Sequence, residues 1–350
     1  MIITNARIFN GQKFIKANTV EVRKNIIKRV YYSKNLKKGI NINNMILCPG
    51  FIDIHTHSSD IDILDVKNDE DVIKLKNRFL QHGTTSFLIT TFYKKNNKKL
   101  INTLNRLQKV KQGARCLGVY FEGPYINKEK QGAIPDEFFD YETNVKDIIK
   151  EYKNLRIMTI APEIKNALKT IKVLKANKII PSFGHSNANF SFAKKSIKYG
   201  IKNVTHLFNA MLKWNENKPS TYQAFLRYKD IFVEVIADGI HVPPDILRLI
   251  YRKFGLRRII LISDKVNNKY LLDRNKKINS KLYLIDMVHN MKKFCHLSME
   301  QILRLATNNP QKLLKLNRIG RIQSGFYADF LILNEDLHIE KIIFNGKIFL

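Results

Sequence analysis

The sequence contains few cysteines, no long apolar segment and no sign of a secretion signal. Cys48, Cys116 and Cys295 are far apart, so we expect reduced thiols rather than disulfides or a Cys-x-x-Cys metal site. No run of about 18 apolar residues occurs, which argues against a membrane span. The stretch Met1–Phe9 reads as a strand and lacks the charged start and apolar core of a signal peptide. We therefore expect a cytoplasmic protein without a membrane partner.

Acidic residues are scarce as well, because 30 Asp and Glu stand against 61 Lys and Arg, giving a formal net charge of +31. Such a charge would suit a nucleic-acid-binding protein. The lysines, however, are spread over the whole chain among many Asn and Ile residues and form no arm or stripe. We therefore expect a solvated basic surface and no nucleic-acid partner, with a positive field that attracts anionic substrates.

The chain does contain a regular alternation of strand-like and helix-like segments. Eight apolar, strand-like runs occupy 46–54, 84–90, 116–121, 156–161, 179–184, 202–206, 231–236 and 258–263. Charged, helix-compatible stretches separate them, such as 70–82, 98–112, 143–153, 166–177 and 244–254. This α/β alternation predicts parallel βαβ units, and eight units favour a closed, eight-stranded β/α barrel of the TIM type. An open doubly wound sheet would need a Gly-rich phosphate turn where this chain has His55-Thr56-His57.

The two ends of the chain predict a second, smaller unit. Strand-like residues 2–9 and 341–344 each precede an Asn-Gly pair, which favours a tight hairpin because both residues tolerate positive φ. Residues 327–333 form a further strand pattern, and 298–314 read as a closing helix with Ser298 as its N-cap. We therefore expect a small β domain built from 1–48 and 315–350, and a barrel domain over 49–314.

Six residues suited to metal chemistry follow the apolar runs. They are His55, His57, Glu122, His185, His206 and Asp264. His55 and His57 are two residues apart in a strand, so both imidazoles point to the same face and can reach one ion. Glu122 and the two later histidines supply one carboxylate and two imidazoles, a set that suits zinc or a similar divalent metal. Because the strand ends of a barrel converge, we expect these side chains to form one site.

Asp264 and His241 are the candidates for catalysis. A carboxylate beside a metal-activated water can take its proton and pass it to a leaving nitrogen, which fits hydrolysis. His241 could polarise a substrate carbonyl or orient a hydroxyl, although a structural role fits its position almost as well. The remaining histidines, which we expect to be structural or solvated, are His82, His289, His296 and His338.

Seven motifs carry a resemblance to a known family. They are Pro49–His57, Phe121–Tyr125, Gly184–Asn187, Thr205–Met211, Ile236–His241, Ile262–Asp264 and Ile319–Asp329. Thr205-His-Leu-Phe-Asn-Ala-Met211 is more specific than a general hydrolase motif. Over nearly its whole length the chain resembles the N-acetylglucosamine-6-phosphate deacetylases of the amidohydrolase superfamily. The resemblance implies a metal-dependent hydrolase that releases acetate from an N-acetylated amino sugar phosphate.

The resemblance also implies roles for individual residues. Glu122, His185 and His206 would bind the main metal, expected to be zinc, and His55 with His57 would hold a second ion in those members that bind two. Asp264 would act as general base and then as acid, and His241 would contact the acetamido oxygen. The residues that would line the sugar site are Gly132, Ala133, Asn209, Ala210, Asn217 and Asp238. The family is usually homodimeric, with each subunit contributing to its neighbour's phosphate pocket.

Three positions depart from the family pattern. Asn217 stands where the family has a phosphate-binding arginine, Ile134 where it has a histidine, and Lys265 where a small residue is usual. Lys213 or Lys218 could bind the phosphate as point charges without the bidentate fork of arginine. Lys265 would favour the ionised form of the preceding aspartate, and the segment 265–297 is shorter than in relatives. Two alternatives therefore stay open: an amidohydrolase that deacetylates a different N-acetyl amino sugar, and a non-catalytic relative with an altered substrate pocket.

Overall fold

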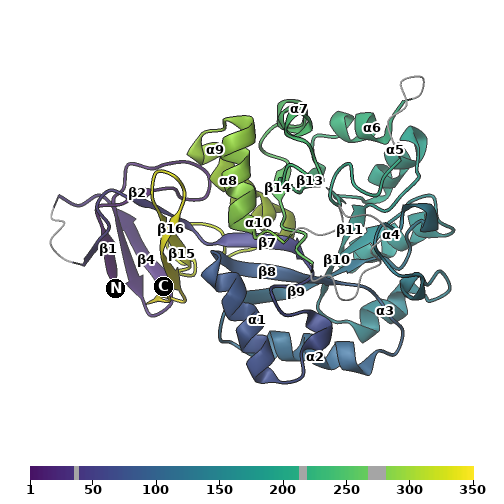
Figure 1. The fold of residues 1–350 in the computed structure, drawn as a ribbon, viewed down its shortest axis with the longest axis horizontal. Coiled ribbons are helices and arrows are strands. Elements are labelled where there is room, and N and C mark those ends of the chain that lie inside the picture. Colours follow the sequence, from purple (N-terminus) through teal and green to yellow (C-terminus); the bar gives the residue numbers. More distant parts are fainter. Residues whose placement is uncertain (35–38, 213–218, 267–280) are drawn as a thin grey trace.

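Eight parallel strands form the central sheet, in the order in which they occur along the chain (Figure 1). They are β7 (Phe51–Thr56), β8 (Thr84–Thr91), β9 (Arg115–Glu122), β10 (Leu155–Ile160), β11 (Ile180–Phe183), β12 (Asn203–Val204), β13 (Phe232–Val235) and β14 (Ile259–Leu261). A backbone hydrogen bond of 3.0 Å from the Asp264 N–H to the His55 carbonyl ties the chain after β14 to β7. The sheet is thereby nearly closed as a barrel, and the predicted fold class is confirmed. In this computed structural model the described residues are 1–34, 39–212, 219–266 and 281–350.

Helices between and after the strands cover the outside of the barrel (Figure 1). They are α1 (Asp69–Gln81), α2 (Lys98–Lys109), α3 (Val145–Glu151), α4 (Ala167–Ala176), α5 (Phe190–Tyr199), α6 (Thr221–Arg227), α7 (Pro244–Phe254), α8 (Leu284–Cys295), α9 (Met299–Ala306) and α10 (Asn308–Leu314). Short 3₁₀ turns lie at η1 (Ile63–Asp65), η2 (Lys128–Lys130) and η3 (Asp136–Phe138). The many asparagines of the chain start several helices: the side chains of Asn68, Asn97 and Asn189 each accept a hydrogen bond from a backbone N–H in the first turn. None of the described helices is both long and apolar enough to cross a bilayer.

The prediction of one closing helix over 298–314 was wrong, because this segment forms two helices. Ser298 caps α9 as expected, with its side chain accepting from the Gln301 N–H. The chain then breaks at Thr307, whose φ of −127° and ψ of −73° are not helical, before α10 begins. Pro310 has no N–H to donate to the carbonyl of Ala306, so a continuous helix would leave that carbonyl unsatisfied.

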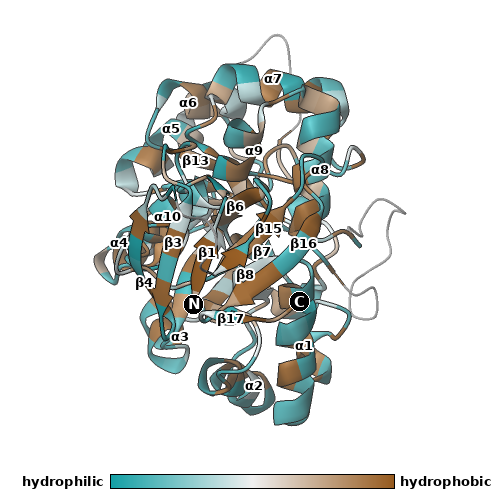
Figure 2. Cartoon of the chain, turned by 90° about the vertical axis from the view of Figure 1, so that its left-hand side faces the viewer, coloured by the Kyte–Doolittle hydropathy of each residue, from teal (hydrophilic) through white to brown (hydrophobic). Residues whose placement is uncertain are grey.

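Two small sheets flank the barrel and take strands from both ends of the chain, at the end of the molecule where both termini lie (Figures 1 and 2). One contains β1 (Ile2–Thr4), β3 (Thr19–Arg23), β4 (Ile26–Tyr31) and β5 (Ile40–Asn41). The other contains β2 (Arg7–Ile8), β6 (Ile46–Pro49), β15 (Phe330–Leu333), β16 (Ile339–Phe344) and β17 (Lys347–Ile348). A separate apolar cluster includes Ile3 and Val20 from the first sheet and Leu47 and Phe330 from the second. The domain division at 48/49 and 314/315 stays a prediction.

The sequence patterns at the two ends were partly correct. Asn345 and Gly346 form the predicted two-residue hairpin between β16 and β17, with φ values of 50° and 72°. The strand predicted over 2–9 instead divides into β1 and β2, which belong to different sheets, and Asn5 between them has a φ of 54°. A left-handed residue cannot continue a strand, so the chain turns there from one sheet to the other.

The first barrel strand, predicted over 46–54, also divides in two. Residues 46–49 form β6 of a small sheet, while β7 of the barrel begins at Phe51. Gly50 joins them, and a Cβ at this position would lie 2.2 Å from the side chain of Thr85. Only glycine fits here, because β8 approaches the backbone closely. Gly50 thus directly connects a strand of a small sheet to the first strand of the barrel.

Candidate metal centre

The carboxyl-terminal edge of the barrel brings the six predicted residues together. His55 lies in β7 and His57 directly after it, and Glu122 is the last residue of β9. His185, His206 and Asp264 follow β11, β12 and β14 by two or three residues. All six side chains are buried or nearly so, with Asp264 the most exposed at 17%. Parallel strands end at one edge of the barrel, which explains how residues more than 200 positions apart meet.

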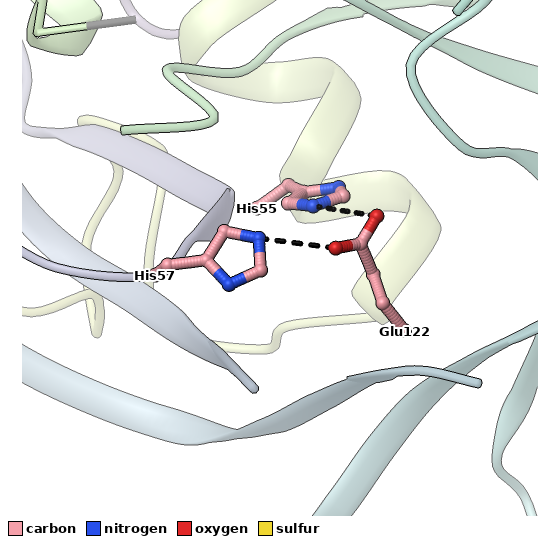
Figure 3. A group of neighbouring side chains, drawn as sticks. All are labelled: His55, His57 and Glu122. Atoms are coloured by element: carbon pink, nitrogen blue, oxygen red, sulfur yellow. Dashed lines mark ion pairs between the residues drawn. The ribbon is translucent and has the colours of Figure 1, made fainter. Parts of the chain in front are cut away.

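Glu122 lies at the centre of the cluster. Its Oε1 is 2.9 Å from His206 Nε2 and 3.0 Å from His185 Nε2. Its Oε2 is 3.1 Å from His57 Nε2, and its Oε1 is 3.5 Å from His55 Nε2 (Figure 3). The carboxylate therefore belongs to two groups of metal-type ligands, one with the β7 histidines and one with the later pair.

Asp264 lies beside the group formed with the β7 histidines. Its Oδ1 is 3.2 Å from His55 Nε2 and 3.5 Å from His57 Nε2. The cluster thus presents four imidazole nitrogens and two carboxylates to a small volume, a donor set typical of one or two divalent ions.

The hydrogen bonds of the imidazoles indicate which nitrogen faces the centre. His185 Nδ1 lies 2.8 Å from the Lys130 carbonyl, which can only accept, so a neutral ring carries its proton on Nδ1 and its lone pair on Nε2. That Nε2 faces His206 Nε2 at 3.1 Å. His55 Nε2 is buried and has no hydrogen-bond partner among the described residues. Inward-facing nitrogens that lack a suitable partner fit a cation that accepts their lone pairs, so the residues present suit a divalent metal.

Glu234, in β13, is a functional candidate that the sequence reasoning missed. It is completely buried, and its Oε2 accepts from His55 Nδ1 at 2.8 Å and from the His206 N–H at 3.2 Å. Its Oε1 accepts from Asn203 Nδ2 at 2.5 Å. This carboxylate holds His55 with Nδ1 protonated and Nε2 directed at the cluster. The signal in the sequence is a lone glutamate within an apolar strand, since a carboxylate is rarely buried without partners.

Electrostatics keep the carboxylates of the cluster ionised. Burial alone would raise the pKa of Asp264, but His55 and His57 outweigh it and hold that pKa well below its usual range. Burial likewise opposes ionisation of Glu122, yet the neighbouring histidines hold its pKa well below the usual value. Two ionised carboxylates in a buried site are ready to bind a cation or, in the case of Asp264, to accept a proton.

Lys265 does not direct its charge into this cluster. Its Nζ donates to the Lys281 carbonyl at 2.6 Å and lies 4.5 Å from the centre of the Tyr283 ring. Its backbone carbonyl accepts from the N–H groups of His57 and Ser58 at 3.0 and 3.1 Å. The residue therefore helps to close the barrel between β14 and β7, and its ammonium group lies against Tyr283.

Three of the cluster residues have backbone conformations that side-chain-bearing residues rarely adopt. His185, His206 and Asp264 have φ values of 48°, 26° and 44°. Each such left-handed residue costs on the order of 1 kcal/mol or more, and such costs concentrate at functional sites. The sharp turn lets each side chain fold back over the barrel mouth directly after its strand ends.

Asp238 and His241 form a pair on the loop after β13. Asp238 Oδ2 accepts from His241 Nδ1 at 2.6 Å, and Oδ1 accepts from the His241 N–H at 2.8 Å. Burial would raise the pKa of Asp238, but its hydrogen bonds with His241 and the loop lower it. The ionised carboxylate orients the imidazole by accepting the hydrogen bond from Nδ1.

The predicted substrate-lining residues are partly brought together. A Cβ on Gly132 would lie 3.6 Å from His185 Cε1, so this glycine borders the cluster. Asn209 Nδ2 donates to the His206 carbonyl at 3.3 Å, and the Ala210 carbonyl accepts from the Ser186 N–H at 3.1 Å. Ala133 follows Gly132 on the same loop and is partly exposed.

Ile134 is linked to this site through Phe92, whose ring centroid lies 5.3 Å from that of His57. It is 3% exposed and packs in a small apolar cluster with Phe92 and Ile126. The departure from the family pattern at this position therefore adds an apolar contact beneath the loop. Asn217, with Lys213 and Lys218, lies outside the described residues, as do 267–280 of the segment 265–297.

Known proteins match this chain over most of its length. Residues 46–349 match the amidohydrolase family. The N-acetylglucosamine-6-phosphate deacetylase of Bos taurus is 30% identical over 340 residues, covering 87% of this chain and 83% of that protein. The crystal structure of N-acetylglucosamine-6-phosphate deacetylase from Thermotoga maritima superposes with a TM-score of 0.86 at 26% identity, covering 99% of each chain. A variant of the Mycobacterium smegmatis deacetylase, in complex with N-acetyl-D-glucosamine-6-phosphate, superposes with a TM-score of 0.90 at 21% identity over 99% of this chain and 98% of that one. This chain belongs to the amidohydrolase family.

Proposed function

We propose that this chain is a metal-dependent N-acetylglucosamine-6-phosphate deacetylase, which hydrolyses the N-acetyl group to give glucosamine 6-phosphate and acetate. The observation that carries the proposal is Asp264, an ionised carboxylate held 3.2 Å from His55 at the edge of a cluster of metal-type ligands. Relatives that cover most of the chain and bear this name support the choice of substrate. The positive charge of the chain suits a phosphorylated sugar.

In this proposal Glu122, His185 and His206 hold the main metal ion, and His55 and His57 hold a second ion where one is present. Zinc is the expected metal, because imidazole and carboxylate donors suit it. When bound, the metal would polarise the amide carbonyl and lower the pKa of a bound water toward neutrality.

The proton transfers belong to residues of the chain. Asp264 accepts a proton from the attacking water and then donates it to the leaving nitrogen, so that the amine departs in a neutral form. The imidazole of His241, oriented by Asp238, donates a hydrogen bond to the acetamido oxygen as negative charge develops there. Gly132, Ala133, Asn209, Ala210 and Asn217 would line the sugar, together with Asp238.

The test is an acetate-release assay combined with metal analysis of the purified protein. We expect turnover of N-acetylglucosamine 6-phosphate with zinc, and a clear preference for it over N-acetylglucosamine and N-acetylgalactosamine 6-phosphate. Asp264→Asn should lose about 10²–10⁴-fold in turnover while it retains the metal. Asp245→Asn, at an exposed ion pair with Arg248, is the matched control and should keep full activity.

Each other outcome is informative. If an unphosphorylated or epimeric sugar is turned over faster than N-acetylglucosamine 6-phosphate, the substrate is that related N-acetyl amino sugar instead. Bound metal without turnover of any of these sugars would indicate a non-catalytic relative. Unchanged activity of Asp264→Asn would reject the proton-transfer role.

We also propose a cytoplasmic homodimer. Phe208, Leu212 and Ile240 are 38%, 44% and 60% exposed on loops that follow the barrel strands near the metal centre. Exposed apolar side chains on one edge favour contact with another protein surface. Analytical ultracentrifugation should give twice the chain mass of 40.9 kDa, and Ile240→Glu should shift the protein toward the monomer.

A further inference from the structure

A cavity opens at the opposite edge of the barrel from the metal centre. It has a volume of about 870 Å³ and lies where β10 to β14 begin. Ile180 and Phe232, the first residues of β11 and β13, line it together with Arg156, the second residue of β10. The end of α10, up to Lys315, forms another wall. A volume of this size is within the range of small-molecule sites.

The cavity is lined by basic residues with almost no acidic ones. The basic residues are Arg156, Lys175, Lys178, Lys202, Lys229, Arg257, Arg258, Lys312 and Lys315, and Asp230 is the one acidic lining residue. The chain as a whole has about half as many acidic as basic residues, so nine cations would ordinarily be accompanied by four or five acids. The basic composition of the chain therefore does not by itself account for this lining.

None of these nine cations forms an ion pair with a carboxylate in the part of the chain that the structure describes. Local roles explain some of the nine: Arg156 donates to the Leu314 carbonyl at 3.2 Å, and Arg258 donates to the Phe254 carbonyl at 3.0 Å. These contacts fix the two guanidinium groups in the cavity wall without neutralising them.

Several lysines have no such role. Lys178, Lys202 and Lys229 are exposed, and their side chains make no hydrogen bond to the described residues. Lys312 lies in the last turn of α10, where the helix dipole favours a cation. Even so, burial and then Arg304, Arg321 and Arg257 lower its pKa, and of these three arginines Arg257 lines the cavity. Arg257 and Lys312, two cations of this cavity, therefore repel each other, and a multivalent anion bound there would relieve that repulsion.

The cavity also has an apolar floor. Ile180, Phe232, Leu313 and Leu314 lie among the cations, and all are buried or partly buried. A purely inorganic anion would leave this floor unused, whereas a molecule with both a phosphate chain and a flat organic group would cover it. We propose that this cavity is a binding site for a small polyphosphate-bearing molecule, with the phosphates on the lysines and guanidinium groups and the organic group on the apolar floor.

Isothermal titration calorimetry of the full-length protein at about 0.15 M salt tests the proposal, since surface charges are well screened there. The probes are inorganic tripolyphosphate, adenosine triphosphate and orthophosphate. We expect saturable binding of one molecule per chain for both polyphosphates, tighter for the nucleotide, and at least tenfold weaker binding of orthophosphate. Tripolyphosphate binding as tight as that of the nucleotide would assign the site to the phosphate chain alone and overturn the role of the floor.

A matched pair of triple variants separates the cavity from the general charge of the chain. Lys178→Ala/Lys202→Ala/Lys312→Ala should weaken polyphosphate binding at least tenfold. The control removes the same charge from exposed lysines elsewhere, as Lys13→Ala/Lys16→Ala/Lys99→Ala, and should change binding less than twofold. Melting temperatures of both variants verify folding.

Three results would overturn the proposal. The first is the absence of saturable polyphosphate binding to the wild-type protein, and the second is equal weakening of that binding by the two triple variants. The third is binding of RNA or DNA oligonucleotides whose affinity falls more in the cavity variant than the affinity for the small polyphosphates does. The deacetylase assay is independent of all three, so failure here leaves the proposed enzymatic function untouched.

Discussion

Replacing Glu234 by glutamine tests how the fold prepares the metal centre. The carboxylate accepts hydrogen bonds on both oxygens, from His55 Nδ1 and the His206 N–H on one side and from Asn203 Nδ2 on the other. Glutamine has the same shape but only one acceptor oxygen, and its amide nitrogen can only donate. Glu234→Gln therefore cannot satisfy all of these donors in the native arrangement.

Two arrangements are open to the variant. If the amide nitrogen faces His55 Nδ1, the imidazole must carry its proton on Nε2, which then cannot bind a metal ion. If the amide oxygen faces His55, the amide nitrogen meets Asn203 Nδ2, and that side chain must turn to present its Oδ1, which has no hydrogen-bond partner in the described structure. Either way the variant loses the charge-assisted bond to His55, worth about 1.5–3 kcal/mol.

The expected result is a loss of metal affinity of about 10–100-fold at the site that His55 serves, equivalent to about 1.4–2.7 kcal/mol. Competition for zinc with a chromophoric chelator measures this loss without reference to catalysis. The metal affinity of the group formed by Glu122, His185 and His206 should change less. Glu234 contacts this group through one hydrogen bond, which the His206 N–H donates over 3.2 Å.

Glu163→Gln is the matched control. The Glu163 carboxylate also accepts three hydrogen bonds, from Asn127 Nδ2 at 3.0 Å, the Asn187 N–H at 2.6 Å and Ser186 Oγ at 2.7 Å, but it contacts no imidazole of the cluster. It should therefore affect stability more than metal affinity. Wild-type zinc affinity at both sites in a well-folded Glu234→Gln protein would refute the reasoning.

The remaining predictions concern stability and metal removal. Burial lowers the pKa of Lys76 to about 8 from an ordinary value of 10.5. Between pH 8 and pH 10.5 the folded chain therefore binds fewer protons than the unfolded chain, so the free energy of unfolding should rise with pH across that window. Lys76→Met should abolish this rise in thermal melts and raise stability at pH 7, whereas Lys74→Met, on the exposed side of α1, should do neither. Gly50→Ala should destabilise the fold by about 1–3 kcal/mol in urea titrations, because the added Cβ would meet Thr85; a neutral result would show that β8 can move. Chelation should lower the melting temperature and zinc should restore it, because a ligand of the folded state stabilises it by mass action; equal melting with and without the chelator would argue against a bound metal.

The barrel and the meeting of the six cluster residues at one edge were predictable because their signals are local. Each strand is an apolar run, and each of the six cluster residues lies at or just beyond the end of such a run. The rule that parallel strands end together then places His55, Glu122 and Asp264 at one edge without knowledge of any contact. The hairpin at Asn345 and Gly346 was predictable for the same reason, since two adjacent residues determine it.

The errors arose where distant parts of the chain decide the local conformation. Gly50 separates two strands because Thr85 of the neighbouring strand leaves no room for a Cβ, and residues 46–54 alone carry no sign of that contact. No local pattern indicated that Ile134 packs against Phe92 and Ile126. Lys265 was expected to influence Asp264, yet its Nζ extends toward Tyr283.

The sequence by itself determined the order of the strands, the barrel class and the set of residues able to bind a metal, because hydrophobic periodicity and residue chemistry are properties of short segments. Only the tertiary structure decided how these residues are held. Glu234 orients His55 from a strand 179 residues away. Nine cations, none in an ion pair with a carboxylate of the described residues, meet in one cavity because five strands begin there. Hydrogen bonds and electrostatic repulsion depend on distances of a few ångströms, and those distances exist only once the barrel has closed.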